Sequence, residues 1–185
     1  MTDIADRHEA LASRFCELAA TVTDWDAPTP VKEWKARDIV AHLCDWLPNM
    51  LHGYGVALEE VVPGDVPAAA FAQHSANVQK LLGDEDQMTR IVETPQGDQP
   101  LANVIESFYL ADVFMHQWDL AKASGQQPNL DPVLTHAIID GMTPIADQLG
   151  ASGQFGTPVV LDESHPAEDR LAALIGRDPQ WKPAA

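Results

Sequence analysis

The stretch LANVIESFYLADVFMHQWDLAKA, residues 101–123, is the longest clean helical pattern in the chain. Apolar side chains recur along it at helical spacing. Gly125 follows it, and a glycine just past the last periodic residue is typical of a helix end. Strong strand patterns are few elsewhere, so the sequence predicts a mainly α protein with a helical bundle at its centre.

Other segments with helical periodicity supply the partners of this helix. Pro48 and Pro144 each lie inside one of them, where a proline kinks or divides a helix. Residues 84–100 contain a short β-like stretch and a Pro-Gly turn, and residues 153–166 are expected to be extended. The predicted additional helices cover residues 3–24, 36–60, 68–83, 131–149 and 167–176.

Composition and charge limit the classes of partner. The chain has 185 residues, 45% of them hydrophobic, which fits one folded domain over residues 1–185. Its 28 acidic and 11 basic residues give a net charge of -17, which repels nucleic acids and anionic membranes. We therefore expect a small-molecule partner. The chain shows no signal peptide and no apolar run of roughly 20 residues, so we expect a cytoplasmic monomer or homodimer.

One pair of residues has the spacing of metal ligands. Asp112 and His116 are four residues apart on the longest helix and share one face of it. His42 lies in the apolar stretch DIVAHLCDWL of another predicted helix and is the best candidate for a third ligand. Two histidines and a carboxylate leave coordination positions open, as a catalytic metal needs. The alternatives are a core histidine satisfied by a hydrogen bond and a simple Asp–His salt bridge.

Several neighbours of these residues have two interpretations each. Asp38 and Asp119 lie within one helical turn of a histidine, so each either orients that imidazole or serves as a helix cap or surface charge. Asp119 is also the alternative ligand to Asp112. Arg177 either pairs with a substrate carboxylate or pins the C-terminal tail through Asp178 or backbone carbonyls.

The remaining candidates are aromatic residues, cysteines and histidines. Tryptophans close to the metal motifs either wall an apolar pocket or belong to the core, and the two cysteines are expected to be reduced, buried thiols. The tryptophans are Trp34, Trp46 and Trp118, the cysteines are Cys16 and Cys44, and the histidines without partner spacing are His8, His52, His74, His136 and His165.

Three segments, WKARDIVAHL, FMHQWDLAKASG and FGTPVVLDESHPAEDRLAALIGRDPQW, together resemble an actinobacterial-type metal-binding family. It belongs to the DinB/YfiT-like superfamily and is related to the N-terminal domain of mycothiol-dependent maleylpyruvate isomerase. The resemblance implies a four-helix bundle in up-down-down-up order, with short extra helices and a small extended C-terminal segment. It implies metal ligands at His42, Asp112 and His116, although the isomerase has a glutamate where this chain has Asp112.

The resemblance also bears on chemistry. Zinc is the default metal for such ligands, and iron, nickel and manganese accept similar ones. Relatives in the superfamily use a low-molecular-weight thiol such as mycothiol, so the first functional hypothesis is a metal-dependent thiol S-transferase or isomerase. A metal-dependent hydrolase or metabolite-tailoring enzyme and a non-catalytic metal-binding protein remain alternatives. Isomerase activity itself is not implied, since this chain has no room for the isomerase's second domain.

Overall fold

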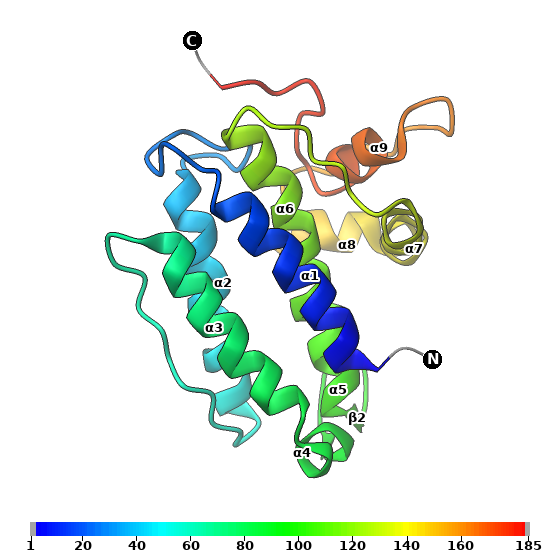
Figure 1. The fold of residues 1–185 in the computed structure, drawn as a ribbon. Helices are drawn as coiled ribbons and strands as arrows, with labels where there is room; N and C mark the ends of the chain where they lie inside the picture. The colour runs from blue at the N-terminus through cyan, green and yellow to red at the C-terminus, as the bar shows by residue number, and fades with distance from the viewer. Residues whose placement is uncertain (1–2, 184–185) are drawn as a thin grey trace.

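Four long helices form a bundle in the computed structural model, which describes residues 3–183. They are α1 (Ile4–Ala19), α2 (Ala36–Gly53), α3 (Pro67–Leu82) and α6 (Ala111–Ala123). α1 and α2 each contact both α3 and α6, so α1 and α2 occupy opposite corners of a square. α1 and α6 run in one direction and α2 and α3 in the other (Figure 1). The mainly α fold and the up-down-down-up bundle are confirmed.

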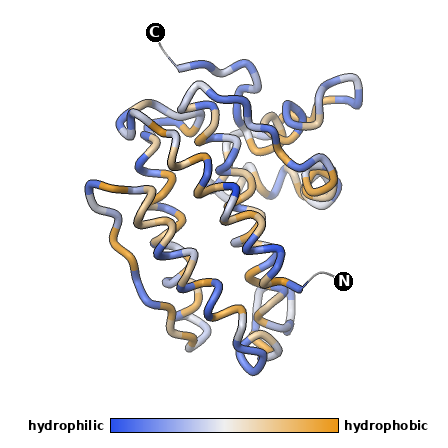
Figure 2. Tube along the Cα trace, in the orientation of Figure 1, coloured by the Kyte–Doolittle hydropathy of each residue, from blue (hydrophilic) through white to orange (hydrophobic). Residues whose placement is uncertain are grey.

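The helices α1, α2 and α3 each bury one stripe of side chains. In α1 the buried positions are Ile4, His8, Ala12, Phe15 and Ala19, which recur every three or four residues as one helical face must. The rings of Phe15 and Phe71 meet with centroids 4.1 Å apart and join α1 to α3. Hydrophobic and hydrophilic residues alternate along these helices in the same way (Figure 2).

The long helix predicted over residues 101–123 has an irregular middle. It consists of α5 (Leu101–Val104), a π-helical turn η1 (Ile105–Leu110) and α6. The π turn was not expected from the periodicity, and such turns often occur at functional sites. In α6 every residue from 113 to 121 is buried, so no face of this helix is left to solvent.

A C-terminal group of short helices covers the outer face of α6. Phe114, Met115 and Trp118 of α6 form a second hydrophobic cluster with this group, separate from the cluster inside the bundle. Pro144 lies in a 3-10 turn between two of the helices, so the predicted bend is confirmed. The group comprises α7 (Pro132–Met142), η2 (Thr143–Ile145), α8 (Ala146–Ala151) and α9 (Ala167–Leu174), and the segment between α8 and α9 has no regular structure.

Several predicted helix boundaries were wrong. The first helix ends at Ala19 rather than at residue 24, and the second ends at Gly53 rather than at residue 60. Residues 54–66 instead return along the length of the bundle, because α2 and α3 run in the same direction (Figure 1). Pro48 is buried inside α2 and does not divide it.

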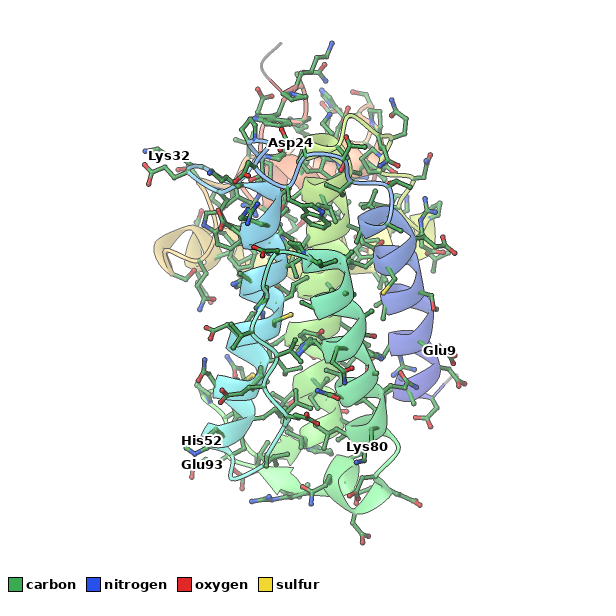
Figure 3. All side chains as sticks on the ribbon, turned by 60° about the vertical axis from the view of Figure 1, so that its left-hand side comes forward. Glu9, Asp24, Lys32, His52, Lys80 and Glu93 are labelled. Carbon is green, nitrogen blue, oxygen red and sulfur yellow. The ribbon has the colours of Figure 1, made fainter. Side chains whose placement is uncertain are left out.

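The two ends of the bundle carry different connections. Asp24 and Lys32 lie in the connection from α1 to α2 at one end, and His52, Lys80 and Glu93 mark the other (Figure 3). At the second end lie the short helix α4 (Glu85–Thr89), which was not predicted, and an antiparallel pair of strands, β1 (Ile91–Val92) and β2 (Gln99–Pro100). Within the described residues, no helix combines the length and apolarity needed to cross a membrane.

Candidate metal centre

His42 of α2 and Asp112 and His116 of α6 converge on one point. His42 Nε2 lies 3.0 Å from Asp112 Oδ2, and His116 Nε2 lies 3.5 Å from Asp112 Oδ1. One ligand atom from each residue lies within 4.8 Å of the other two. The i, i+4 spacing on α6 and the contact of α2 with α6 together produce this cluster.

Two of the three separations are close to those that a bound ion requires, and the ligand atoms of His42 and His116 lie within 4.8 Å of each other. Ligand atoms about 2.1 Å from a common ion, at tetrahedral or octahedral angles, lie about 3.0–3.4 Å apart. The two carboxylate–imidazole separations of 3.0 and 3.5 Å fall close to that range. The aspartate is therefore long enough to reach both imidazoles, although it is one methylene shorter than a glutamate.

Asp119 orients the His116 ring from the side away from the cluster. Its Oδ2 lies 2.9 Å from His116 Nδ1, so that nitrogen carries a proton, and Nε2, which faces Asp112, is the nitrogen left to bind either a second proton or a metal ion. A carboxylate on the second nitrogen is the usual support of a metal-bound histidine. The prediction that Asp119 orients the imidazole thus agrees with the geometry.

Arg177 completes this chain of contacts. Its Nε and Nη2 donate to Oδ1 and Oδ2 of Asp119, each at 3.1 Å, and its Nη1 donates to the Ile175 carbonyl. Such a two-pronged pair fixes the carboxylate in its plane. Arg177 therefore holds the C-terminal segment against α6 directly behind His116, through Asp119 rather than Asp178.

Two indoles flank the cluster. Trp46 Nε1 donates to Asp112 Oδ2 at 2.9 Å and so restrains the carboxylate. The Trp34 ring lies 5.1 Å from the His42 ring and 5.7 Å from the His116 ring, centroid to centroid. Trp118 points elsewhere and packs into the second hydrophobic cluster, as expected of a core residue.

Comparison with known proteins shows the family of the chain. The family of the mycothiol maleylpyruvate isomerase N-terminal domain matches residues 8–121. The chain belongs to this family. Two proteins of Mycobacterium tuberculosis, uncharacterized protein MT0763 of strain CDC 1551 and uncharacterized protein Rv0738 of strain H37Rv, are similar to it over 174 residues. Each is 26% identical, covering 92% of this chain and 95% of the relative, whereas no solved structure matches.

The match to the mycothiol maleylpyruvate isomerase N-terminal domain includes the three clustered residues but only one of the two side chains behind His116. His42, Asp112, His116 and Asp119 fall within residues 8–121, whereas Arg177 lies beyond them. The C-terminal segment, outside the matched residues, therefore supplies the Arg177 guanidinium behind the cluster.

Electrostatics favour a cation at this point. Burial acts to raise the pKa of Asp112, but the His116 and His42 imidazoles bring it below its ordinary value. Burial likewise opposes ionisation of Asp119, while His116 and Arg177 lower its pKa. With neutral imidazoles, two carboxylates and one guanidinium leave a net negative charge in a mostly buried site, which a divalent ion would compensate.

Burial of His116 acts to lower its pKa, yet Asp112 and Asp119 together raise it. In the absence of a cation, a proton on this imidazole serves the same purpose as an ion would, because it offsets the two carboxylates. Proton and metal therefore compete for the same lone pair.

For Asp38 the structure decides between the two interpretations in favour of the helix cap, and two other expectations were incomplete. Asp38 does not contact His42, because its Oδ2 accepts from the Lys35 backbone N–H and caps α2. Cys44 is buried as expected, but Cys16 is only partly so. The contact of Trp46 with Asp112 was not foreseen, because nothing in the local sequence fixes which side chain its N–H will meet.

Proposed function

We propose that this protein binds one divalent metal ion, zinc by default, through His42, Asp112 and His116. We further propose that it uses the ion to activate a low-molecular-weight thiol of the mycothiol type for S-transfer or thiol-assisted isomerisation. The observation that carries the proposal is the convergence of these three side chains, with Asp119 holding His116 in the ligating tautomer. Two imidazoles and a carboxylate suit zinc, and iron, nickel and manganese accept the same donors.

The cluster is partly exposed to solvent, most of all at His42. The His42 side chain is 32% exposed and that of Asp112 18%, whereas that of His116 is 6% exposed. A substrate would therefore approach past His42, between Trp34 and Trp46. Three protein ligands leave at least one coordination position for it.

The sulfur of the reaction would arrive with the substrate. Burial raises the pKa of Cys44 to about 12 and also raises that of Cys16, so both remain protonated near neutral pH. A protonated thiol is a poor nucleophile. A metal ion at the cluster would stabilise the thiolate of an incoming thiol.

The protein's own residues would then bind and orient the thiolate. In S-transfer, the sulfur forms a bond to an electrophilic carbon, the leaving group departs with its bonding pair, and the thiol proton passes to solvent on the His42 side. In isomerisation, the same sulfur would add to a carbon–carbon double bond conjugated to a carbonyl, whose oxygen takes up the electron pair. Rotation about the resulting single bond would precede return of that pair, which re-forms the double bond and expels the thiolate. The indoles of Trp34 and Trp46, which lie beside the His42 ring, would shield the electrophile from water.

Cobalt substitution tests the metal and the thiol separately. We expect the protein to bind one equivalent of Co²⁺, and a mycothiol-like thiol to produce a sulfur-to-cobalt charge-transfer band in the visible spectrum. His42→Ala should abolish the band. His52→Ala on the same helix is the matched control and should leave it unchanged, since His52 lies at the other end of the bundle (Figure 3).

The outcomes distinguish the two parts of the proposal. Bound cobalt without a band at saturating thiol would discard the thiol and leave metal-activated water as the chemistry. Failure of cobalt to bind at all, in a folded protein, would overturn the metal site. Loss of helical circular dichroism on chelation would assign the ion a structural rather than a catalytic role.

A further inference from the structure

A second group of polar side chains lies inside the bundle, away from the three clustered residues. His8 of α1, His74 of α3 and Tyr109 of the π turn are 2%, 0% and 0% exposed. His8 Nε2, both ring nitrogens of His74 and Tyr109 Oη are buried and lack any hydrogen-bond partner among residues 3–183. A buried polar atom without a partner is destabilising, so four of them on three neighbouring side chains require an explanation.

The tautomer of His8 follows from its neighbours. Gln79 Nε2 donates to the Ala5 carbonyl, which leaves Gln79 Oε1 to face His8 Nδ1. Because an amide oxygen only accepts, Nδ1 must carry the proton. His8 Nε2 is therefore a bare lone pair directed into the bundle.

The rings of His8 and His74 both lie beside the ring of Tyr109. The ring of Tyr109 lies 6.2 Å from that of His8 and 5.8 Å from that of His74, centroid to centroid. His8 is also close enough to His74 to influence its ionisation. These rings are neighbours, yet none of their unpartnered atoms bonds another.

We propose that His8, His74 and Tyr109 form a second binding site, in the bundle interior, for a small neutral hydrogen-bonding ligand, namely ordered water. Tyr109 Oη can donate, His8 Nε2 can accept, and a neutral His74 offers one donor and one acceptor. Water has two donors and two acceptors, and buried waters typically make about three hydrogen bonds. One or two molecules would satisfy all four atoms.

A metal ion fits the same atoms less well. Burial keeps the pKa of His74 low, about 4, and also lowers that of His8, so both imidazoles are neutral near neutral pH. Cys44 stays protonated, and Asp112 already faces His42 and His116. With no buried carboxylate of its own, the site gives a divalent cation nothing to offset its charge.

The site is linked to the candidate metal centre through Tyr109. The Trp46 ring lies 5.9 Å from the Tyr109 ring, and Trp46 in turn donates to Asp112. The π turn thus places one residue between the two sites. The proposal does not depend on the function proposed above, since it rests on the unpartnered atoms alone.

The sign of a single stability change tests the proposal. If Tyr109 donates to bound water, Tyr109→Phe removes that hydrogen bond and should lower the Tm by about 2–4 °C. If the hydroxyl is unpartnered, removing it should raise the Tm, and that result would overturn the proposal. Tyr54→Phe, at the other tyrosine of the chain, is the matched control and should leave the Tm unchanged.

Two further measurements identify the ligand. Magnetic relaxation dispersion of water nuclei should count at least one fewer long-lived internal water in the Tyr109→Phe, His74→Leu double variant than in the unmodified protein; equal counts would contradict the proposal. Zinc titration should give the same stoichiometry for His74→Leu as for the unmodified protein. Loss of a zinc equivalent in that variant would show a cation site instead of a water site.

Discussion

At the scale of single residues, Asp119 is the group whose environment constrains the others most. Its side chain is fully buried, and its two oxygens accept from both Arg177 and His116. A buried carboxylate is tolerated only when it is paired and hydrogen-bonded. Arg177 therefore stabilises the fold and, by fixing Asp119, also fixes the direction of His116 Nε2.

Arg177→Met should weaken both stability and metal binding. It leaves Asp119 buried with one partner fewer, which should lower the free energy of unfolding by on the order of 3–5 kcal/mol. Loss of the support behind His116 should weaken zinc binding about 10- to 100-fold. Urea denaturation and zinc competition with a chromophoric chelator measure the two effects.

The control for this prediction is an exposed arginine pair. Arg14 contacts Glu17 at the surface, so Arg14→Met should change stability by no more than about 0.5 kcal/mol. Arg177→Lys keeps the charge but loses the two-pronged geometry. The stability that it loses should therefore lie between the losses in Arg177→Met and in Arg14→Met. Zinc affinity unchanged in Arg177→Met would show that Asp119 holds His116 without help.

The sequence predicts clustered residues well where their relation is local. Asp112 and His116 share a helix face by spacing alone, and the apolar stretch around His42 directs it into the bundle. The pairing of Arg177 with Asp119 spans 58 residues, and it depends on how the C-terminal segment packs on α6. Spacing left two roles open for Asp38, and only the structure shows that its carboxylate caps α2 instead of contacting His42.

At the scale of elements, two glycines set the path of the C-terminal segment. Gly176 ends α9 with a φ of 74°, and a Cβ added to it would lie 2.3 Å from the Gly156 carbonyl carbon. The Gly176 N–H bonds the Ala173 carbonyl, and the Arg177 N–H bonds the Ala172 carbonyl. This close crossing positions Arg177 immediately after the turn.

Gly176→Ala should therefore destabilise the protein by about 1–3 kcal/mol, because a side chain there meets backbone atoms and an unfavourable φ. Gly141→Ala makes the same change inside α7, where a Cβ meets nothing within 4 Å. Alanine favours the helix there, so Gly141→Ala should stabilise by about 0.5–1 kcal/mol. In urea denaturation, the midpoint should fall for Gly176→Ala and rise for Gly141→Ala. Shifts of the same sign would contradict the explanation that the backbone at Gly156 leaves no room for a side chain at position 176.

Helix existence could be predicted from periodicity, but helix boundaries and irregularities could not. The patterns over residues 68–83 and 101–123 correspond to α3 and to the α5–η1–α6 run. Apolar residues continue past Gly53 without continuing the helix, because residues 54–66 must cross the bundle. The π turn leaves no mark in a 3.6-residue pattern.

At the scale of the whole molecule, α6 belongs to two hydrophobic clusters at once. The bundle covers one side of it and α7, α8 and α9 the other (Figure 1). The direction of the four long helices came from the family resemblance, since periodicity says nothing about how helices are connected in space. The buried histidines inside the bundle were missed, because they show no partner spacing in the sequence.

Those buried histidines predict how the whole fold responds to acid. Burial brings the pKa of His74 to about 4, against about 6.5 for an unfolded chain, and burial also lowers the pKa of His8. Between about pH 4 and pH 6.5, the His74 side chain therefore binds more protons in the unfolded chain than in the folded one. The free energy of unfolding contributed by His74 is therefore fully present above about pH 6.5 and is lost as the pH falls toward 4.

His74→Leu should flatten this part of the pH profile. In metal-free protein, the loss of stability between pH 6.5 and 4 should be smaller in the variant by on the order of 3 kcal/mol, as a shift of this size implies. His136→Leu, at an exposed position of α7, should follow the unmodified protein. Because the carboxylates and His116 titrate in all three proteins, only the difference between the curves reports on His74. Parallel curves for His74→Leu and the unmodified protein would mean that this imidazole gains a proton in the folded state as readily as in the unfolded one.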